Sequence, residues 1–285
     1  MSPIPFQQVD VFTTVPFKGN PVAVVLDGNR LSTEQMQAIA NWTNLSETTF
    51  VCAATNAQAD YRLRIFTPRS ELPFAGHPSI GSAHAVLRNG LKPKRAGHLV
   101  QECARGLVPL VVDYGRLFLA LPQPALREIA LAQSAELAAA LGIAMDSVRS
   151  AATIDVGVAW ITLQLADAAM VRRLQPDQAR LRALTPAGVA GVTVFGFAPA
   201  NSRPEIEVRS FAPAEGIAED PVCGSGNGCV AALIRRDRMI SASTYTAAQG
   251  ACLGREGRVE VRFDQDGTIW LGGSAVTCVE GVLHA

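Results

Sequence analysis

The pattern of apolar and polar residues along the chain predicts many short strands interspersed with a few amphipathic helices. Apolar residues at three- and four-residue spacing predict helices at residues 32–44, 79–87, 131–141 and 227–236. Short apolar runs or alternations between turn residues predict strands, principally at residues 9–12, 22–26, 45–51, 61–66, 107–113, 117–121, 158–165, 191–197, 205–211, 258–263 and 268–271. This mixture favours an α/β protein.

Two local signals divide the chain further. Ser32 and Gln35 have the spacing of a capping box, which predicts that a helix begins at Ser32 and ends near Asn44. The segment 122–124, Pro-Gln-Pro, breaks the pattern of strands. We therefore expect one domain at residues 1–123 and a second at 124–285, with the last strand of the chain returning toward the first domain.

The two halves of the chain resemble each other, which indicates an internal repeat. Residues 62–68 resemble residues 207–213, and Ala75-Gly76-His77 then matches Cys223-Gly224-Ser225. A repeat predicts two similar α/β domains related by a pseudo-twofold axis. The helix N-termini, expected at Pro78 and near Asn227, would then both face a cleft between the domains. Because helix N-termini favour anions, a small carboxylate is the expected ligand.

Residues 216–228 gather the densest set of reactive groups in the chain. They contain Glu219, Asp220, Cys223 and Ser225 together with four glycines. Glycine is unfavourable inside a helix, so we expect a tight loop here that leads into a helix N-terminus. A carboxylate and a thiol beside such an anion site could transfer a proton. The alternative is a purely structural turn between strand and helix.

Composition excludes several classes of function. The chain has 285 residues, 48% of them hydrophobic and 18% charged, and no formal net charge, so no electrostatic feature favours nucleic acid or an anionic membrane as a partner. No apolar stretch reaches the length of a membrane span, and no signal peptide is evident. The six cysteines are scattered and form no Cys-x-x-Cys pair or metal-ligand spacing with the histidines. We expect a cytoplasmic protein with reduced thiols and no bound metal.

Several motifs in order along the chain resemble the phenazine-biosynthesis-F-like (PhzF-like) family. They lie at residues 17–24, 44–50, 64–68, 71–78 and 219–225, and the region that contains them covers most of the chain. The resemblance implies a fold like that of diaminopimelate epimerase, with two α/β domains, each a curved and mostly antiparallel sheet around a central helix. It also implies cofactor-independent isomerase activity and a homodimer.

The resemblance assigns roles to particular residues. The glutamate of the motif Leu-Ser-Glu-Thr-Thr-Phe is the family's essential acid/base, which places that role on Glu47. The family's histidine and aspartate fall on His77 and Asp220. Its Gly-Ser pair falls on Gly224 and Ser225. Local sequence alone favours an outward-pointing strand residue for Glu47, and it offers a packed residue at the start of a helix as the alternative for His77.

The chemistry of these residue types agrees with such roles. A carboxyl group in a closed cleft loses solvation, which raises its pKa and lets it act as base and then as acid. Asp220 and His77 could orient the substrate. Gly76, Gly224 and Ser225 could donate hydrogen bonds to the substrate carboxylate, and Ser46 joins them as a candidate substrate-binding residue.

Cys223 departs from the family pattern, in which threonine is common before the Gly-Ser pair. Cysteine at this position resembles diaminopimelate epimerase and its racemase relatives, which use one thiol from each half. Here Ala75 stands at the matching position of the first half, so a two-thiol racemase is disfavoured. A helix N-terminus lowers the pKa of a thiol, which would permit Cys223 to act with Glu47. The alternative is a small buried thiol in place of threonine.

Three functional hypotheses follow. The first is a cofactor-independent isomerase that moves a proton on a small, anionic, carboxylate-bearing metabolite through Glu47. The second is an amino-acid epimerase or racemase that uses the Cys223 thiol. The third is a small-ligand-binding protein without turnover on the same fold.

Overall fold

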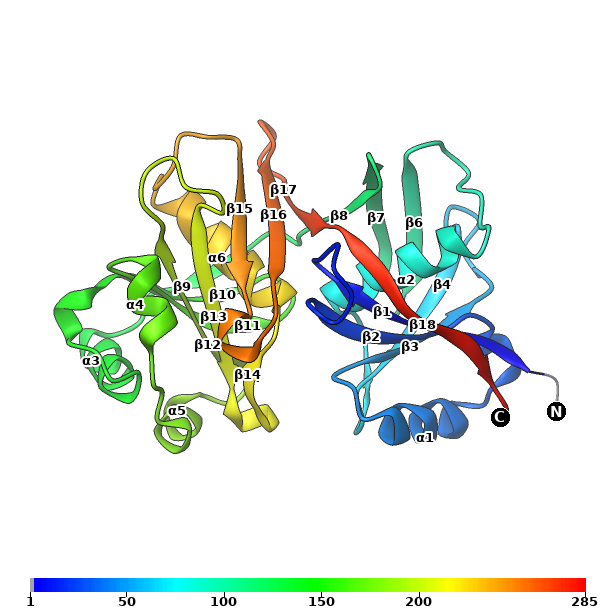
Figure 1. Ribbon diagram of the computed structural model, residues 1–285, viewed down its shortest axis with the longest axis horizontal. Helices are drawn as coiled ribbons and strands as arrows, with labels where there is room; N and C mark the ends of the chain where they lie inside the picture. Colours follow the sequence, from blue (N-terminus) through cyan, green and yellow to red (C-terminus); the bar gives the residue numbers. More distant parts are fainter. Residues whose placement is uncertain (1–2) are drawn as a thin grey trace. The chain divides into compact units, whose positions relative to one another are not determined.

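The computed structural model describes residues 3–285, which divide into two compact units (Figure 1). Unit 1 extends to Ala120 and also includes Gly272–Ala285, and unit 2 comprises Leu121–Leu271. The sequence predicts a boundary at 123/124 and a last strand that returns toward the first domain. Three-ten turns occur at Gly28–Arg30, Met145–Ser147, Pro213–Glu215 and Ala251–Leu253.

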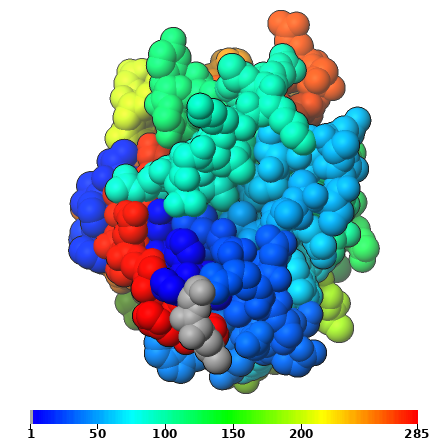
Figure 2. Space-filling view, turned by 90° about the vertical axis from the view of Figure 1, so that its right-hand side faces the viewer, coloured from blue at the N-terminus to red at the C-terminus, as the bar shows by residue number. Residues whose placement is uncertain are grey.

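Unit 1 is a mostly antiparallel sheet with two helices. Its strands are β1 (Ile4–Val11), β2 (Asn20–Val25), β3 (Thr48–Cys52), β4 (Tyr61–Phe66), β5 (Glu71–Leu72), β6 (His98–Cys103), β7 (Gly106–Asp113), β8 (Arg116–Ala120) and β18 (Ala275–Leu283). Only the pairs β2–β3 and β4–β6 are parallel among the pairings described within this unit. β18 pairs with β1, and Figures 1 and 2 show this red segment beside the blue one.

The two helices of unit 1 are α1 (Thr33–Thr43) and α2 (Gly76–Arg88). At the start of α1, the Gln35 N–H donates to the Ser32 side chain and the Ser32 N–H donates to the Gln35 side chain, so the predicted capping box is confirmed. α2 is the central helix, and most of its residues are buried. A β-carbon on its Gly81 would lie 2.4 Å from a methyl group of Val22, which shows how closely α2 packs against β2.

The strands of unit 2 also pair mostly antiparallel, and the unit has four helices. Its strands are β9 (Ala125–Arg127), β10 (Val148–Asp155), β11 (Ala159–Leu165), β12 (Val189–Phe197), β13 (Ile206–Ala212), β14 (Ile217–Asp220), β15 (Thr244–Gln249), β16 (Gly257–Phe263) and β17 (Ile269–Gly273, which ends in unit 1). The helices are α3 (Leu131–Ala140), α4 (Ala168–Arg173), α5 (Gln178–Leu184) and the central, largely buried α6 (Gly224–Arg236).

The two units repeat the same strand order and the same pairing directions. The series β1, β2, β3, β4, β5, α2, β6, β7 in unit 1 corresponds to β10, β11, β12, β13, β14, α6, β15, β16 in unit 2. In both series the second and third strands are parallel, as are the fourth strand and the strand that follows the central helix. The predicted internal repeat is therefore confirmed.

The repeat extends to side chains. Arg64 on β4 makes a two-pronged ion pair with Glu71 and lies over the ring of Phe66. Arg209 on β13 does the same with Glu219 and the ring of Phe211. An arginine fork of this kind fixes the geometry of both partners. Each fork thus fixes the short strand that precedes a central helix.

The glycine-rich segment 224–228 is helical, so the predicted loop there is wrong. α6 begins at Gly224 rather than near Asn227, and α2 begins at Gly76 rather than at Pro78. The physical reason is packing: a β-carbon at Gly226 would lie 2.6 Å from Ser210 Oγ. Glycine lets the first turn of α6 approach β13, and this contact outweighs the weak helix propensity of about 1 kcal/mol per glycine.

Candidate functional site

Glu47 lies immediately before β3, at the end of the connection from α1. The connection turns at Asn44, which adopts a left-handed conformation at the C-cap of α1. The Ala23 N–H donates to the Glu47 carbonyl, and the Thr49 hydroxyl pairs with the Ser82 hydroxyl on α2. These bonds fix the backbone of Glu47 against β2 and α2. Glu47 is therefore not an outward-pointing residue within a strand.

Glu47 and His77 form a close pair inside unit 1. Their Oε2 and Nε2 atoms are 3.3 Å apart, and their side chains are only 16% and 8% exposed. His77 is the second residue of α2, after Gly76. Glu47 Oε2 accepts no hydrogen bond from the residues described. The structure thus brings the side chains of Ser46 and His77 to the Glu47 carboxyl group, and Gly76 directly precedes His77 in the chain.

Burial raises the pKa of Glu47 to about 7, and a hydrogen bond with the Ser46 side chain opposes this rise. A carboxyl group with this pKa exchanges between its two protonation states near neutral pH. This is the property that an acid/base catalyst requires, since the same group must accept and return a proton. The environment of Glu47 therefore suits proton transfer.

This pKa also predicts how stability depends on pH. An unfolded Glu47 loses its proton near pH 4.5 and the folded one near pH 7, so the folded state binds more protons between these values. The contribution of Glu47 to the free energy of unfolding is complete below pH 4.5. It falls by about 3 kcal/mol in total as the pH rises toward 7. We expect Glu47→Gln to remove this loss, so the variant gains stability relative to wild type between pH 4.5 and 8.

Urea denaturation at several pH values checks this prediction. Glu136→Gln, at an exposed position on α3, is the matched control for the loss of one carboxyl group. A stability difference between Glu47→Gln and wild type that does not change with pH would contradict a raised pKa for Glu47.

A second set of predicted site residues lies in unit 2, at the start of α6. Asp220 ends β14, and its Oδ1 accepts a hydrogen bond from the Val222 N–H. Cys223 is the N-cap of α6, and its Sγ accepts the N–H of Gly226. Gly224 and Ser225 follow as the first two helical residues, just as Gly76 and His77 follow Ala75 on α2. The alignment of the two halves made from the sequence therefore holds at both helix starts.

Ser225 has a partner that sequence reasoning missed. The indole Nε1–H of Trp160 on β11 donates to Ser225 Oγ over 2.9 Å. Because the Ser225 oxygen accepts this bond, the hydroxyl proton of Ser225 points away from Trp160. Trp160 stands in an apolar strand and is itself buried, so its composition and spacing are those of an ordinary core residue.

The pKa of Cys223 is raised, contrary to the lowering expected at a helix N-terminus. The thiol is 2% exposed, and loss of solvation is the largest cause, followed by the negative charge of Asp220. Hydrogen bonds with Ser225 and Gly226 oppose the rise without reversing it. Burial therefore outweighs the helix dipole here, and the thiolate that a racemase needs is disfavoured.

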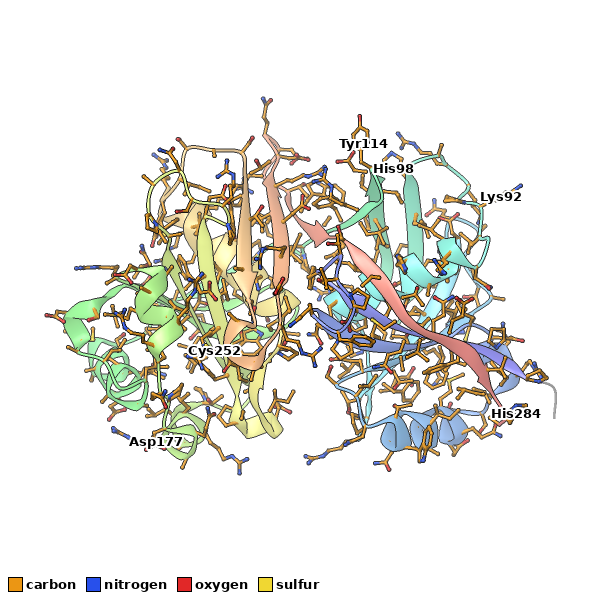
Figure 3. The ribbon with its side chains drawn as sticks, viewed as in Figure 1. Lys92, His98, Tyr114, Asp177, Cys252 and His284 are labelled. Carbon is orange, nitrogen blue, oxygen red and sulfur yellow. The ribbon has the colours of Figure 1, made fainter. Side chains whose placement is uncertain are left out.

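The described part of the chain contains no group of three or more His, Cys, Asp or Glu side chains arranged to hold a metal ion. Two of the histidines, His98 and His284, lie at opposite ends of unit 1 (Figure 3). Among residues 3–285 no helix has the length and apolar character needed to cross a bilayer.

Comparisons with known proteins agree with this fold. The chain is 40% identical to "antisense-enhancing sequence 1" of Schizosaccharomyces pombe, an alignment that covers 97% of each chain. It is 35% identical to the trans-2,3-dihydro-3-hydroxyanthranilate isomerase of Pseudomonas chlororaphis, over 96% of this chain and 97% of the relative. A crystal structure of a PhzF-family phenazine biosynthesis protein from Bacillus anthracis superposes with a TM-score of 0.87 over the whole of both chains, at 24% identity.

The solved structure confirms the predicted fold class, and the relatives named as isomerases confirm the prediction of an isomerase. The family model described as "phenazine biosynthesis-like protein" matches residues 9–281. From the extent of this match and of the alignments with its relatives, the chain belongs to the phenazine biosynthesis-like (PhzC-PhzF) family.

Proposed function

We propose that this protein is a cofactor-independent isomerase that moves a proton between two carbons of a small, carboxylate-bearing molecule, with Glu47 as the acid/base. The observation that carries the proposal is the buried Glu47 carboxyl group, whose pKa is raised to about 7 and which lies 3.3 Å from His77. The Glu47 carboxylate takes a proton from an acidic C–H, and the electron pair of that bond enters the conjugated system of the substrate. Glu47 then returns the proton to another carbon, so no redox partner is needed.

The other predicted site residues have supporting roles in this proposal. His77 orients the substrate or polarises its amine or hydroxyl group. Gly76 and Ser46 adjoin the pair and are proposed to bind the substrate. Asp220, Gly224 and Ser225 are proposed to hold its carboxylate, a role that rests on the family motif and on their place at the start of α6. The homodimer and the cytoplasmic location stay predictions.

The substrate class comes from a relative. A protein 35% identical to this chain is named trans-2,3-dihydro-3-hydroxyanthranilate isomerase. This compound carries a carboxylate, an amine and a hydroxyl group on a ring, and a C–H that becomes acidic through conjugation. It is therefore the probe that the proposal favours.

The test is incubation of the protein with trans-2,3-dihydro-3-hydroxyanthranilate in D₂O, followed by proton NMR. We expect an isomerised product in which the carbon that receives the proton carries deuterium, protium or both, depending on how fast Glu47 exchanges with solvent. Binding of the compound without isomerisation or exchange would instead support the ligand-binding hypothesis. Exchange at an α-carbon of an amino acid that Cys223→Ser abolishes and Glu47→Gln preserves would support the thiol epimerase.

A further inference from the structure

Both central helices begin with the same buried hydrogen-bond arrangement. On α2, the hydroxyl of Ser79, the fourth residue, donates to the carbonyl of the N-cap Ala75 over 2.8 Å. On α6, the side-chain amide of Asn227, also the fourth residue, donates to the carbonyl of the N-cap Cys223 over 2.9 Å. Each of these two side chains closes the first turn of its own helix.

A buried glutamine contacts each of these closing residues from the strand that follows the helix. Gln101 on β6 donates to Ser79 Oγ over 2.9 Å, and Gln249 on β15 accepts from Asn227 Nδ2 over 2.7 Å. Both glutamines follow their partners by 22 positions. The arrangement is therefore part of the internal repeat, although one helix uses a hydroxyl group and the other an amide.

Both glutamines are fully buried and make further hydrogen bonds. Gln101 Oε1 accepts from the hydroxyl of Tyr61. Gln249 Oε1 also accepts from the N–H of Cys223, and its Nε2 donates to the carbonyl of Asp220. Glutamine is seldom buried, since its amide must find partners that replace water. Here those partners surround the starts of the two central helices.

We propose that Gln101 and Gln249 are positioning residues that fix the first turns of α2 and α6, and with them the side chains that act on the substrate. This inference rests on the proposed function, because it is the roles of Glu47, His77, Asp220 and Ser225 that give the positioning its purpose. Gln101 acts through Ser79 on the turn that carries His77. Gln249 bonds both ends of the segment from Asp220 to Cys223, because it donates to the Asp220 carbonyl and accepts from the Cys223 N–H.

The glycines of α6 explain why such a restraint is needed. Gly224, Gly226 and Gly228 all lie in its first five residues, and each glycine weakens a helix by about 1 kcal/mol relative to alanine. A first turn of this composition needs hydrogen bonds from side chains to stay closed. Asn227 and Gln249 supply them, and the Asn227 Oδ1 atom makes no hydrogen bond among the described residues. The amide nitrogen of Asn227, which donates to Cys223 and Gln249, is therefore the atom that closes the turn.

The experiment compares Gln101→Leu and Gln249→Leu with Gln7→Leu. Gln7 is the matched control, because it is equally buried and bonded to the Thr277 hydroxyl, away from either helix start. Two readouts need no substrate. One is the titration of Glu47 followed by ¹³C NMR on protein with labelled glutamate carboxyl groups, assigned with Glu47→Gln. The other is the rate at which N-ethylmaleimide modifies Cys223, followed by peptide mass spectrometry.

We expect each glutamine variant to affect its own unit. Gln101→Leu should lower the midpoint of the Glu47 titration by at least about 0.5 pH unit, because a looser α2 start admits water to the carboxyl group. Gln249→Leu should raise the rate of Cys223 modification by roughly tenfold, because opening of the segment exposes the thiol. With an identified substrate, Gln249→Leu should raise KM by about tenfold with a smaller change in kcat.

Asn227→Ser and Asn227→Ala keep the test decisive if Gln249→Leu does not fold. Ser79 shows that a hydroxyl group at this helix position can bond the N-cap carbonyl, so Asn227→Ser should retain most of the protection of Cys223 and Asn227→Ala should lose it. Equal behaviour of the two would overturn the positioning role. So would glutamine variants that change the readouts no more than Gln7→Leu, or that change both readouts in both units. Wild-type protein without turnover would contradict the proposed function, but not the positioning if both readouts respond.

Discussion

Replacing Glu47 by glutamine is expected to lower kcat by about 10²–10⁴-fold, the usual contribution of a positioned general acid or base. Glutamine keeps the shape of the side chain and its place beside His77, but it cannot accept and return a proton. Steady-state kinetics on an identified substrate measure the effect. Because the loss is expected in the chemical step, KM should change far less than kcat.

The control for this variant is Glu136→Gln, which removes a carboxyl group from an exposed position on α3. Full turnover in Glu47→Gln would contradict the proposed mechanism. Loss of turnover in Cys223→Ser together with full turnover in Glu47→Gln would transfer the reaction to the thiol. Deuterium exchange measured on the same samples separates a failure of proton abstraction from a failure of later steps.

The largest expected effect on stability comes from Arg209→Met. Arg209 and Glu219 are 8% and 9% exposed and are joined by a two-pronged ion pair. A further guanidinium nitrogen of Arg209 donates to the carbonyls of Val171 and Leu174. The substitution leaves the Glu219 carboxylate and two carbonyl groups without their partner in the interior. Loss of one member of a buried ion pair costs about 3–5 kcal/mol.

The internal repeat provides the matched control, Arg64→Met. Arg64 and Glu71 form the same fork, but their side chains are 18% and 36% exposed. Water can replace the lost partner there, so we expect a cost of about 1 kcal/mol or less. Urea denaturation measures both variants. Equal losses would show that burial does not set the strength of these pairs.

The double variant Arg209→Met with Glu219→Leu refines the argument. Replacement of a whole buried ion pair by apolar side chains is often neutral, whereas removal of one member is not. We therefore expect the double variant to recover most of the stability that Arg209→Met loses. A double variant as unstable as the single one would place the loss in the carbonyl groups that Arg209 bonds.

Sequence reasoning succeeded where the signal was local. The capping box of α1 and the strand β4 at residues 61–66 were both predicted from neighbouring residues. The short helices α4 and α5 were missed, although Asp167 and Asp177 cap them with side-chain hydrogen bonds. Each helix has only one or two turns, so apolar periodicity has too little length to reveal it.

The start of α6 was predicted wrongly because the deciding contact is not local. Glycine at positions 224, 226 and 228 argued for a loop, but the close approach of Gly226 to Ser210 favours a helix. Ser210 lies on a strand that precedes this segment and pairs with β14. Helix propensity reflects only the local sequence, and the tertiary contact between Gly226 and Ser210 overrides it here.

The close pair of Glu47 and His77 could be predicted only in part from the sequence. The family motif assigns Glu47 a role, while its local sequence favours an outward-pointing strand residue. Burial and the nearby His77 side chain support the proposed role, and both depend on the packing of α2. Gln101 and Gln249 escaped notice because a glutamine in a strand has no distinctive pattern. Their common 22-residue spacing within the repeat was the available signal.

The pairing of β18 with β1 has a consequence for how the protein is made. The ribosome completes the whole of unit 2 before it synthesises β18, which closes the sheet of unit 1 beside β1. Unit 2 is one continuous stretch of chain, so all of its residues are synthesised before β18. Unit 1 must wait with the edge of β1 uncovered, although it contains the first residues to emerge. The half of the molecule that carries Glu47 is thus the last to be finished.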